Sequence, residues 1–328
     1  MSELRWNPLL KTFTIVASNR QGRPNMPKDW CPFCPGSGKV PEHYEVLVYP
    51  NDFPALSPNP PAPDLESEQM YTVAPSYGVC EVILYSPDHY TSLPHLSVTH
   101  IKKLIDLWTE RFELHAKDKK IKYIFEFENR GEVVGVTMPH PHGQLYGYSF
   151  LPLKLKVELE SCREYYKATG KDLLGEMNRQ ESAFKKRVVA ENDSFIAYLP
   201  FFTDYPYGLF IVSKHQKGNF TQFDEKEKQD LAEMLKNSTG ALDTLFDKPF
   251  PYMMCIHQTP VNMEEFEDSG DYYRFHIEFY PPLRDANRVK FYASSEMGAW
   301  AATNTRAVEE TAEELRICFQ KFKEQKAS

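Results

Sequence analysis

The segment 138–144, Met-Pro-His-Pro-His-Gly-Gln, holds the densest group of side chains that could do chemistry. His140 and His142 are two positions apart, so on a β-strand both imidazoles would lie on the same face, and Pro141 between them would stiffen that geometry. A neutral imidazole attacks phosphorus near pH 7 without a partner base, and the phospho-histidine bond that forms is reactive enough to be passed on. We therefore expect one histidine to carry a nucleotidyl group while the other is held elsewhere.

Cys31 and Cys34 enclose Pro-Phe and have the spacing of a zinc knuckle. Four-coordinate zinc needs two further nitrogen or sulfur ligands. The candidates are His140 and one of His89, His43 or His95. We favour His89, because it follows a predicted strand. The alternative interpretation of the two cysteines is a redox motif or two unrelated thiols.

Strand and helix patterns indicate that two similar units follow each other along the chain. A strand at 82–85 precedes an amphipathic helix at 97–114, and a strand at 208–215 precedes a helical pattern at 224–245. Each helix is followed by a short strand, a polar interruption and a histidine-containing strand. The sequence therefore predicts a mixed α and β fold with an internal duplication, the alternative being coincidence between two common strand-helix-strand units.

A long helical pattern at 155–184 separates the two units. We expect an N-terminal domain over 1–155, a linking helix over 156–185 and a C-terminal domain over 186–328.

Composition and charge exclude several classes of protein. The 328 residues include 38 Lys and Arg against 46 Asp and Glu, and the formal net charge of −8 argues against general nucleic-acid binding. No apolar run approaches the roughly 20 residues of a membrane-spanning helix, and residues 1–20 lack the apolar stretch of a signal peptide. We therefore expect a cytoplasmic protein with reduced or metal-bound cysteines, in which a few local cations meet any anionic substrate.

Several separated segments together resemble the histidine triad nucleotide transferases, and in particular the galactose-1-phosphate uridylyltransferase family. They run in family order over nearly the whole chain: Arg5-Trp-Asn-Pro8, Arg20 to Pro24, 31–34, Asn51-Asp-Phe53, Ser86-Pro-Asp-His89, Phe127-Glu-Asn129, 139–144, Ser149-Phe-Leu-Pro152, Phe279-Tyr-Pro-Pro282 and Lys290-Phe291. The resemblance implies an α+β fold of two tandem histidine-triad-like domains, each an antiparallel sheet packed with helices. The second domain would be degenerate and would carry a sugar-binding segment.

The resemblance also implies a role for each matching position. His142 would be the nucleophile that takes the uridylyl group, and Gln144 would bind the non-bridging phosphate oxygens. Arg20 and Arg23 would supply positive charge to the nucleotide phosphates. The remaining substrate contacts would be Phe33, Asn51, Asp52 and Phe53 for the uridine, Asn129 and Thr137 for the phosphates or sugar, and Lys290, Phe291 and Glu296 in the sugar-binding segment.

Two metal positions follow from the same resemblance. A structural zinc would be held by Cys31, Cys34, His89 and His140, so that the metal fixes the strand that presents the nucleophile. A second ion, iron or zinc, would be held by Glu158, His257, His276 and Glu278. Glu278 stands where the usual pattern has a third histidine, and the alternative is that these four are ordinary polar residues of the second unit.

The implied reaction is a ping-pong transfer of UMP from UDP-glucose to galactose-1-phosphate, giving UDP-galactose and glucose-1-phosphate. The implied enzyme is a homodimer in which segment 290–302 reaches the nucleotide site of its partner. Ser295 stands where a tyrosine is common and Ala302 where a glutamine is expected, which leaves open a nucleotide-sugar phosphorylase or another hexose-1-phosphate nucleotidylyltransferase of the superfamily. A non-catalytic, zinc-stabilised nucleotide-binding module is the other alternative.

Overall fold

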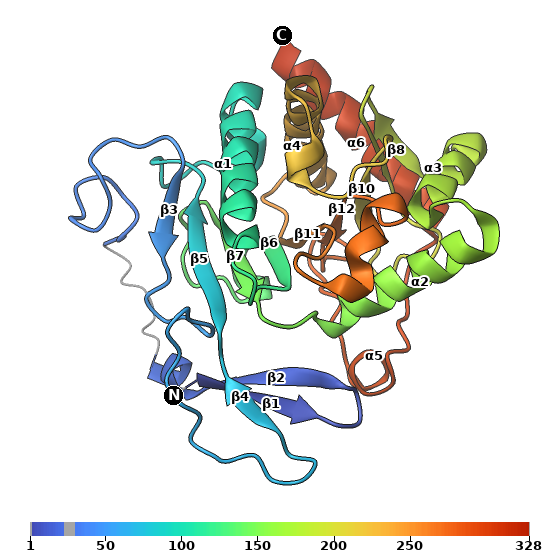
Figure 1. The fold of residues 1–328 in the computed structure, drawn as a ribbon. Helices are drawn as coiled ribbons and strands as arrows, with labels where there is room; N and C mark the ends of the chain where they lie inside the picture. Colours follow the sequence, from blue (N-terminus) through green and yellow to red (C-terminus); the bar gives the residue numbers. More distant parts are fainter. Residues whose placement is uncertain (1, 23–29, 328) are drawn as a thin grey trace.

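A continuous sheet of nine strands forms the body of the structure, a computed structural model that describes residues 2–22 and 30–327 (Figure 1). Its strands are β3 (Leu47–Pro50), β5 (Gly78–Leu84), β6 (Tyr123–Arg130), β7 (His142–Tyr148), β8 (Val188–Glu191), β9 (Phe195–Tyr198), β10 (Leu209–Ser213), β11 (Tyr252–His257) and β12 (His276–Tyr280). They are antiparallel to their neighbours and lie in the order β3-β5-β7-β6-β11-β12-β10-β9-β8.

The two halves of this sheet repeat one arrangement. In the first half the chain runs through β5, helix α1 (Val98–Ala116), β6 and β7, and in the second through β10, helix α4 (Glu225–Leu245), β11 and β12. The halves meet where β6 pairs with β11, with Arg130 opposite Tyr252 and Phe127 opposite Cys255. The strand order is mirrored about this pair. The predicted α+β fold of two tandem antiparallel units is confirmed, and the two units share one sheet.

Helices α1, α4 and α6 (Val308–Ala327) cover one face of the sheet (Figure 1). Apolar residues at helical spacing, such as Ile101, Leu104 and Trp108 in α1, are buried against strand residues including Leu145. Ser97 begins α1 by accepting a hydrogen bond from the backbone of His100. The apolar stripes thus fix the helices on this face and leave the opposite face for the chemistry.

Helices α2 (Leu153–Thr169) and α3 (Leu173–Phe184) lie beside the second half of the sheet (Figure 1). The segment expected as one linking helix is therefore two helices. Gly170 ends α2 with a φ of +69°, a left-handed conformation that glycine adopts without strain, and Asp172 caps α3 by accepting from the backbone of Gly175. The domain boundaries themselves stay a prediction.

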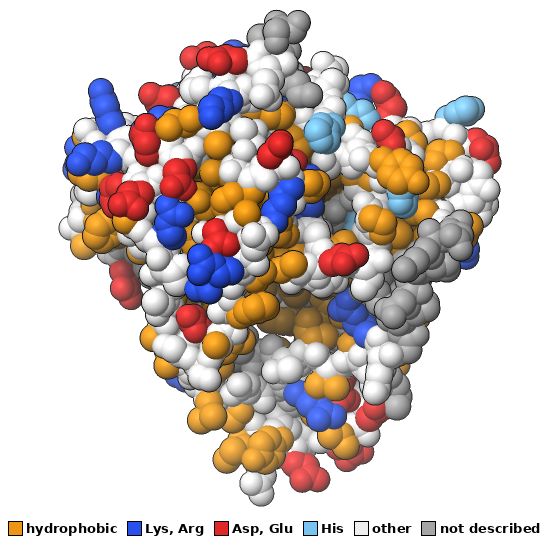
Figure 2. All heavy atoms as spheres, turned by 180° about the vertical axis from the view of Figure 1, so that it is seen from behind, with side chains coloured by type: hydrophobic (Ala, Val, Ile, Leu, Met, Phe, Trp, Pro, Cys, Tyr) orange, Lys and Arg blue, Asp and Glu red, His pale blue; other side chains and the backbone are white. Residues whose placement is uncertain are grey.

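The remaining elements are short. A three-stranded antiparallel sheet, in the order β2-β1-β4, lies apart from the main sheet. These elements are β1 (Ser2–Asn7), β2 (Thr12–Ala17), β4 (Val73–Pro75), α5 (Ser294–Ala299) and the 3₁₀ helices η1 (Ser18–Gly22), η2 (Leu93–His95), η3 (Glu132–Val134), η4 (Phe220–Gln222) and η5 (Glu264–Asp271). Seen from behind, the surface is hollowed between the broad upper body and the narrower lower part (Figure 2). Within the described ranges, no helix combines the length and apolar character needed to cross a membrane.

Candidate active site and metal sites

His142 is the first residue of β7, and the proline before it explains why the strand begins there. The backbone N–H of Tyr85 donates to the Pro141 carbonyl at 3.0 Å, but Pro141 has no N–H to return. Regular pairing therefore starts with His142 opposite Leu84. The expectation that both histidines lie on the strand was wrong for His140, which lies just before it.

The His142 ring is oriented by a backbone carbonyl. Its Nδ1 lies 2.7 Å from the carbonyl oxygen of His140, so Nδ1 carries the proton and donates it. The other nitrogen, Nε2, then keeps its lone pair. That tautomer is the one a nucleophile needs.

Two cavities meet at this ring. The larger, of about 330 Å³, is lined by Arg20, Phe127, Asn129, Gly135, Val136, Thr137, Met138, His142, Gln144 and Tyr146. The smaller, of about 90 Å³, is lined by Pro32, Phe33, Tyr49, Asn51, Asp52, Phe53, Val82, Met138, His142 and Gln144. Arg20 gives the larger cavity a cation, and no described carboxylate lines it, whereas Asp52 lines the smaller one. A phosphate is therefore favoured in the larger cavity, and a group with hydroxyl or amide donors in the smaller one.

The sequence-predicted nucleotide contacts divide between these cavities. Arg20, Asn129 and Thr137 lie in the larger cavity, and the predicted uridine contacts lie in the smaller one. Gln144 belongs to both. Arg23 lies outside the described residues. Their individual roles stay predictions.

The predicted sugar contacts do not line either cavity within the chain. Lys290 is buried, with its Nζ 4.4 Å from the Tyr292 ring centre and 3.9 Å from Glu296. Phe291, by contrast, is 73% exposed. The Ser295 hydroxyl donates to the Ala301 carbonyl at 2.9 Å.

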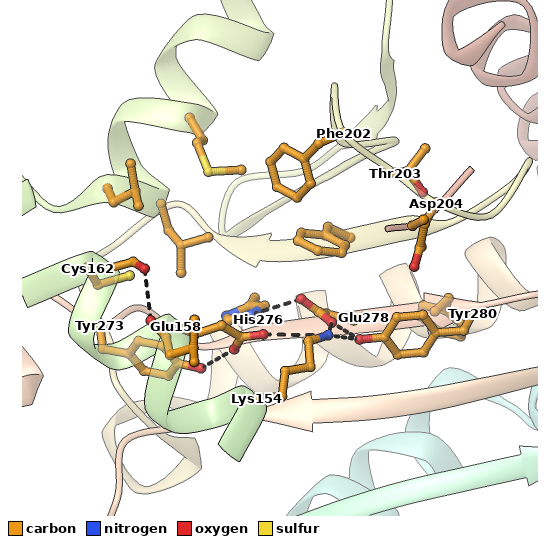
Figure 3. Close-up of a pocket in the computed structure, with 18 residues that line it drawn as sticks. Lys154, Glu158, Cys162, Phe202, Thr203, Asp204, Tyr273, His276, Glu278 and Tyr280 are labelled. Atoms are coloured by element: carbon orange, nitrogen blue, oxygen red, sulfur yellow. Dashed lines mark hydrogen bonds and ion pairs between the residues drawn. The ribbon is translucent and has the colours of Figure 1, made fainter. Parts of the chain in front are cut away.

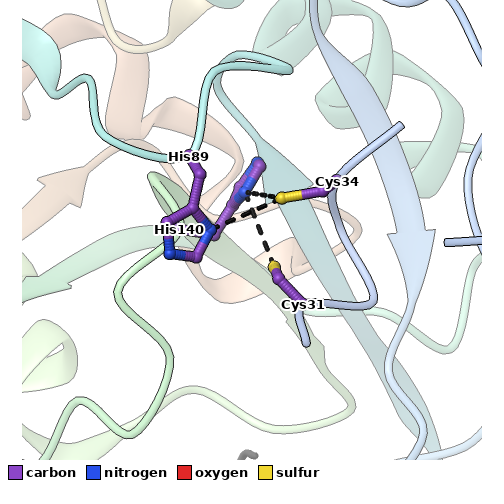
Figure 4. A group of neighbouring side chains, drawn as sticks. All are labelled: Cys31, Cys34, His89 and His140. Atoms are coloured by element: carbon purple, nitrogen blue, oxygen red, sulfur yellow. Dashed lines mark hydrogen bonds between the residues drawn. The ribbon is translucent and has the colours of Figure 1, made fainter. Parts of the chain in front are cut away.

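Cys31, Cys34, His89 and His140 come together as a group with metal-ligand geometry (Figure 4). Cys34 Sγ lies 3.5 Å from His89 Nδ1 and 3.7 Å from His140 Nδ1, and Cys31 Sγ lies 3.7 Å from His140 Nδ1. A tetrahedral zinc with ordinary bond lengths would place sulfur and nitrogen ligands about 3.6 Å apart. The donor set therefore fits a four-coordinate metal, and His89 is the histidine that completes it.

The ring of His140 is held for this role by its other nitrogen. Nε2 lies 2.8 Å from the Ser86 carbonyl and 3.2 Å from the Tyr44 hydroxyl, so Nε2 carries the proton and Nδ1 faces the cysteines. Burial lowers the pKa of His140 to about 4. The imidazole is thus neutral at pH 7, as a metal ligand must be.

A second quartet, Glu158, His257, His276 and Glu278, also brings its ligand atoms together. His257 and His276 are opposite each other on β11 and β12, and Glu278 follows two positions along β12 on the same face. Glu158 reaches them from α2, where its Oε2 lies 2.8 Å from His257 Nδ1. These side chains could hold a metal, and its identity and presence stay a prediction.

The Lys154 side chain contacts Glu158 and Glu278 of this quartet (Figure 3). Its Nζ is 2.5 Å from Glu278 Oε2 and 3.5 Å from Glu158 Oε1, and it also donates to the Tyr280 hydroxyl. The two carboxylates hold the pKa of Lys154 above its ordinary value despite the desolvation of the ammonium. The donor set as it stands is therefore already engaged by a cation.

Sequence reasoning missed two residues of these sites. Lys154 and Glu158 are four positions apart on a predicted helical segment, a spacing that favours an ion pair, so a signal existed for Lys154. For Tyr44 there was none, because its hydroxyl reaches His140 from a loop 96 residues away in the chain.

The fold and the site together define a nucleotidyl transferase. Residues 5–152 match the family model "Galactose-1-phosphate uridyl transferase, N-terminal domain", and residues 158–327 match its C-terminal domain. The chain belongs to the galactose-1-phosphate uridylyltransferase family and is an enzyme that transfers a nucleotidyl group.

Relatives of known name cover nearly the whole chain. The galactose-1-phosphate uridylyltransferase of Thermotoga maritima is 39% identical over 96% of this chain and 98% of its own length, and that of Saccharomyces cerevisiae is 32% identical over 90% and 89%. A solved uridylyltransferase superposes with a TM-score of 0.88 at 31% identity, and the match covers 97% of this chain and 99% of that one. The structure of an ADP-glucose phosphorylase from Arabidopsis thaliana superposes with a TM-score of 0.73 at 26% identity. This match covers 96% of this chain and 99% of that one.

Proposed function

We propose that this enzyme transfers UMP from UDP-glucose to galactose-1-phosphate through a uridylyl-histidine on His142. The observation that carries the proposal is the His142 tautomer at the junction of the two cavities: Nδ1 is bound to a carbonyl, and Nε2 keeps its lone pair. The names of the relatives favour UDP-sugars and hexose-1-phosphates as substrates.

The reaction has two balanced displacements. His142 Nε2 attacks the α-phosphorus of UDP-glucose, the phosphorus–oxygen bond to the leaving group breaks, and glucose-1-phosphate departs with that electron pair. A phosphate oxygen of galactose-1-phosphate then attacks the same phosphorus and releases the histidine. Both the leaving group and the acceptor are weakly basic phosphates, so neither step needs a strong general acid.

The surrounding residues would position and neutralise the reacting phosphate. Arg20 supplies positive charge in the larger cavity, and the Gln144 amide would donate to a non-bridging oxygen. The smaller cavity would hold uridine between Phe33 and Phe53, with Asn51 and Asp52 as its polar contacts.

A zinc ion at Cys31, Cys34, His89 and His140 would act structurally in this proposal. All four positions would be protein ligands, which leaves no place for a catalytic water. The ion would anchor His140, whose carbonyl in turn holds the His142 ring.

The acceptor site would be completed by a second copy of the chain. Phe291, Met297 and Trp300 are 73%, 66% and 63% exposed, and the predicted sugar contacts do not line the His142 cavities of their own chain. We infer a homodimer in which segment 290–302 acts on the site of the partner.

Labelling tests the covalent step. UDP-glucose labelled at the α-phosphorus should leave one acid-labile adduct per chain, mapped to His142. His142→Gly should abolish the adduct and lower turnover on the order of 10⁴-fold or more, while His215→Gly, at an exposed histidine, should label normally. UMP binding without an adduct in the unaltered enzyme would support a non-catalytic binding module instead.

A nucleotide-sugar phosphorylase is the second candidate, favoured by Ser295, Ala302 and the likeness to an ADP-glucose phosphorylase. The acceptor profile separates the two. We expect the uridylylated enzyme to react with galactose-1-phosphate and not with inorganic phosphate. Turnover of ADP-glucose with phosphate alone would replace the first proposal by the second.

A further inference from the structure

The ammonium of Lys154 contacts both carboxylates of the second quartet. It donates hydrogen bonds to Glu278 Oε2 at 2.5 Å and to the Tyr280 hydroxyl, and it forms an ion pair with Glu158 Oε1 at 3.5 Å. The Tyr280 hydroxyl also donates to Glu278 Oε2, so this oxygen is shared by two donors. Figure 3 shows these groups meeting on the floor of a cavity of about 370 Å³.

The position of Lys154 in its helix makes this placement informative. Lys154 lies in the first turn of α2, where the helix dipole disfavours a cation, and no acidic residue occupies that turn. The favourable partners of the ammonium are therefore the two quartet carboxylates. The Lys154 side chain as a whole is 56% exposed, so the ammonium reaches the carboxylates from the surface of the cavity.

Both histidines direct their Nε2 atoms toward Glu278. His257 Nδ1 donates to Glu158 at 2.8 Å, and His276 Nδ1 donates to the Arg274 carbonyl at 2.9 Å. Their remaining nitrogens, both Nε2, each lie 3.6 Å from a Glu278 oxygen. The Lys154 ammonium therefore faces the same carboxylate as both imidazoles, and its charge balances that of Glu278.

A metal and the lysine would compete for that place. An ion bound to Glu278 Oε2 at an ordinary length would lie within about 4.6 Å of Nζ, and two cations that close beside the buried Glu278 carboxylate repel each other. The quartet is also satisfied without a metal: the Tyr273 hydroxyl donates to Glu158 at 3.0 Å. No buried polar side-chain atom of the quartet lacks a hydrogen-bond partner among the described residues.

We propose that the Lys154 ammonium is the resident cation of the Glu158–His257–His276–Glu278 quartet and excludes a metal ion from it. Among the described residues, the cysteine knuckle is then the one group left to bind a metal. The expected second iron or zinc is replaced by a side chain, and the reaction at His142 does not depend on this exchange.

Metal content tests the proposal directly. The purified full-length protein is equilibrated with Zn²⁺, and separately with Fe²⁺ under anaerobic conditions, then desalted and measured by plasma mass spectrometry. Lys154→Met should bind one more ion per chain than the unaltered protein, and the double variant Lys154→Met with His276→Leu should lose that ion. Lys154→Arg, which keeps the charge, should bind no extra ion.

Thermal unfolding gives a second readout that does not depend on activity. Added Zn²⁺ should raise the Tm of Lys154→Met and leave that of Lys154→Arg unchanged, because only a ligand bound to the native state stabilises it. An ion in the unaltered protein that His276→Leu removes would overturn the proposal. A Lys154→Met protein that folds, by its circular dichroism, and gains no ion would overturn it as well.

Discussion

At the residue scale, two neighbouring imidazoles differ in which ring nitrogen carries the proton. His140 donates a hydrogen bond from Nε2 to the Ser86 carbonyl, and its Nδ1 faces the cysteines. His142 donates from Nδ1 to the His140 carbonyl, which leaves the lone pair on Nε2. In each case a backbone carbonyl selects the tautomer. The spacing in the sequence predicted a carrier and an anchor, but the choice of nitrogen depends on carbonyl positions that only the folded chain defines.

Removing the Tyr44 hydroxyl should weaken the knuckle. Tyr44→Phe deletes a contact at 3.2 Å to His140 Nε2 and a hydrogen bond at 2.7 Å to the Phe33 carbonyl. We expect metal affinity to fall about tenfold, measured by competition with a chelator. Tyr90→Phe, at a 91% exposed tyrosine beside His89, is the control and should change little. Equal affinity in both variants would contradict this role of Tyr44.

Glu126 should make stability depend on pH. It is fully buried on β6, accepts from Gln258 at 2.8 Å, and burial raises its pKa from 4.5 to about 8. Between these values the folded protein keeps a proton that the unfolded chain releases, so the free energy of unfolding falls as pH rises.

The check is the free energy of unfolding from urea titrations at pH 5, 6.5 and 8. Glu126→Gln cannot ionise, so its stability relative to the unaltered protein should increase with pH. For Glu113→Gln, at an exposed position on α1, the free energy of unfolding should change with pH as it does in the unaltered protein. A constant difference between Glu126→Gln and the unaltered protein would contradict the expectation.

At the scale of elements, the strand β7, which begins at His142, is packed too closely to accept a side chain at the position after His142. A Cβ on Gly143 would lie 2.3 Å from the Tyr85 hydroxyl oxygen and 3.0 Å from the Phe127 carbonyl oxygen. Neighbouring strands therefore hold the backbone beside His142 from both sides. The glycine that follows the histidine pair is a packing requirement of β7.

Gly143→Ala should therefore destabilise the protein by about 1–3 kcal/mol, measured by urea unfolding, and should lower turnover. Gly147→Ala in the same strand is the matched control, since its closest contact would be a side-chain carbon at 3.3 Å. Adding Tyr85→Phe to Gly143→Ala should recover part of the loss. An unchanged stability in Gly143→Ala would show that β7 can shift.

Periodicity predicted α1 and α4 well, since their buried stripes are long and uninterrupted. It missed the break at Gly170 because a single glycine within a long helical pattern is weak evidence against a helix. The spacing of Cys31 and Cys34 likewise predicted a metal site, with His140 as one of its ligands. It could not locate Lys154 on Glu278, because that contact joins a helix to a strand 124 residues away.

At the scale of the whole molecule, the two units share an architecture but differ in chemistry. The first unit places His142 at open cavities, whereas the equivalent face of the second holds Glu278 bound to Lys154. In the proposed mechanism the first unit carries the reaction, and the second contributes the segment 290–302 that we infer to serve a partner.

Hybrid enzymes test that inference. Co-expressing His142→Gly with Lys290→Met should restore roughly a quarter of normal activity, because half of the dimers would be mixed and each would contain one complete site. If Lys290→Met lowers the Tm, Phe291→Ala replaces it. A site built within one chain predicts no activity in the mixture, so an inactive mixture with verified mixed dimers would contradict the shared site.

The pairing of β6 with β11 also has a consequence for synthesis on the ribosome. β6 ends at Arg130, and its partner β11 begins only at Tyr252. One edge of β6 therefore stays unpaired while about 120 further residues are synthesised, which takes roughly 6–24 s at ordinary translation speeds. An open strand edge invites pairing with other chains during that interval. The nascent N-terminal half is therefore the stage at which this protein is most exposed to aggregation.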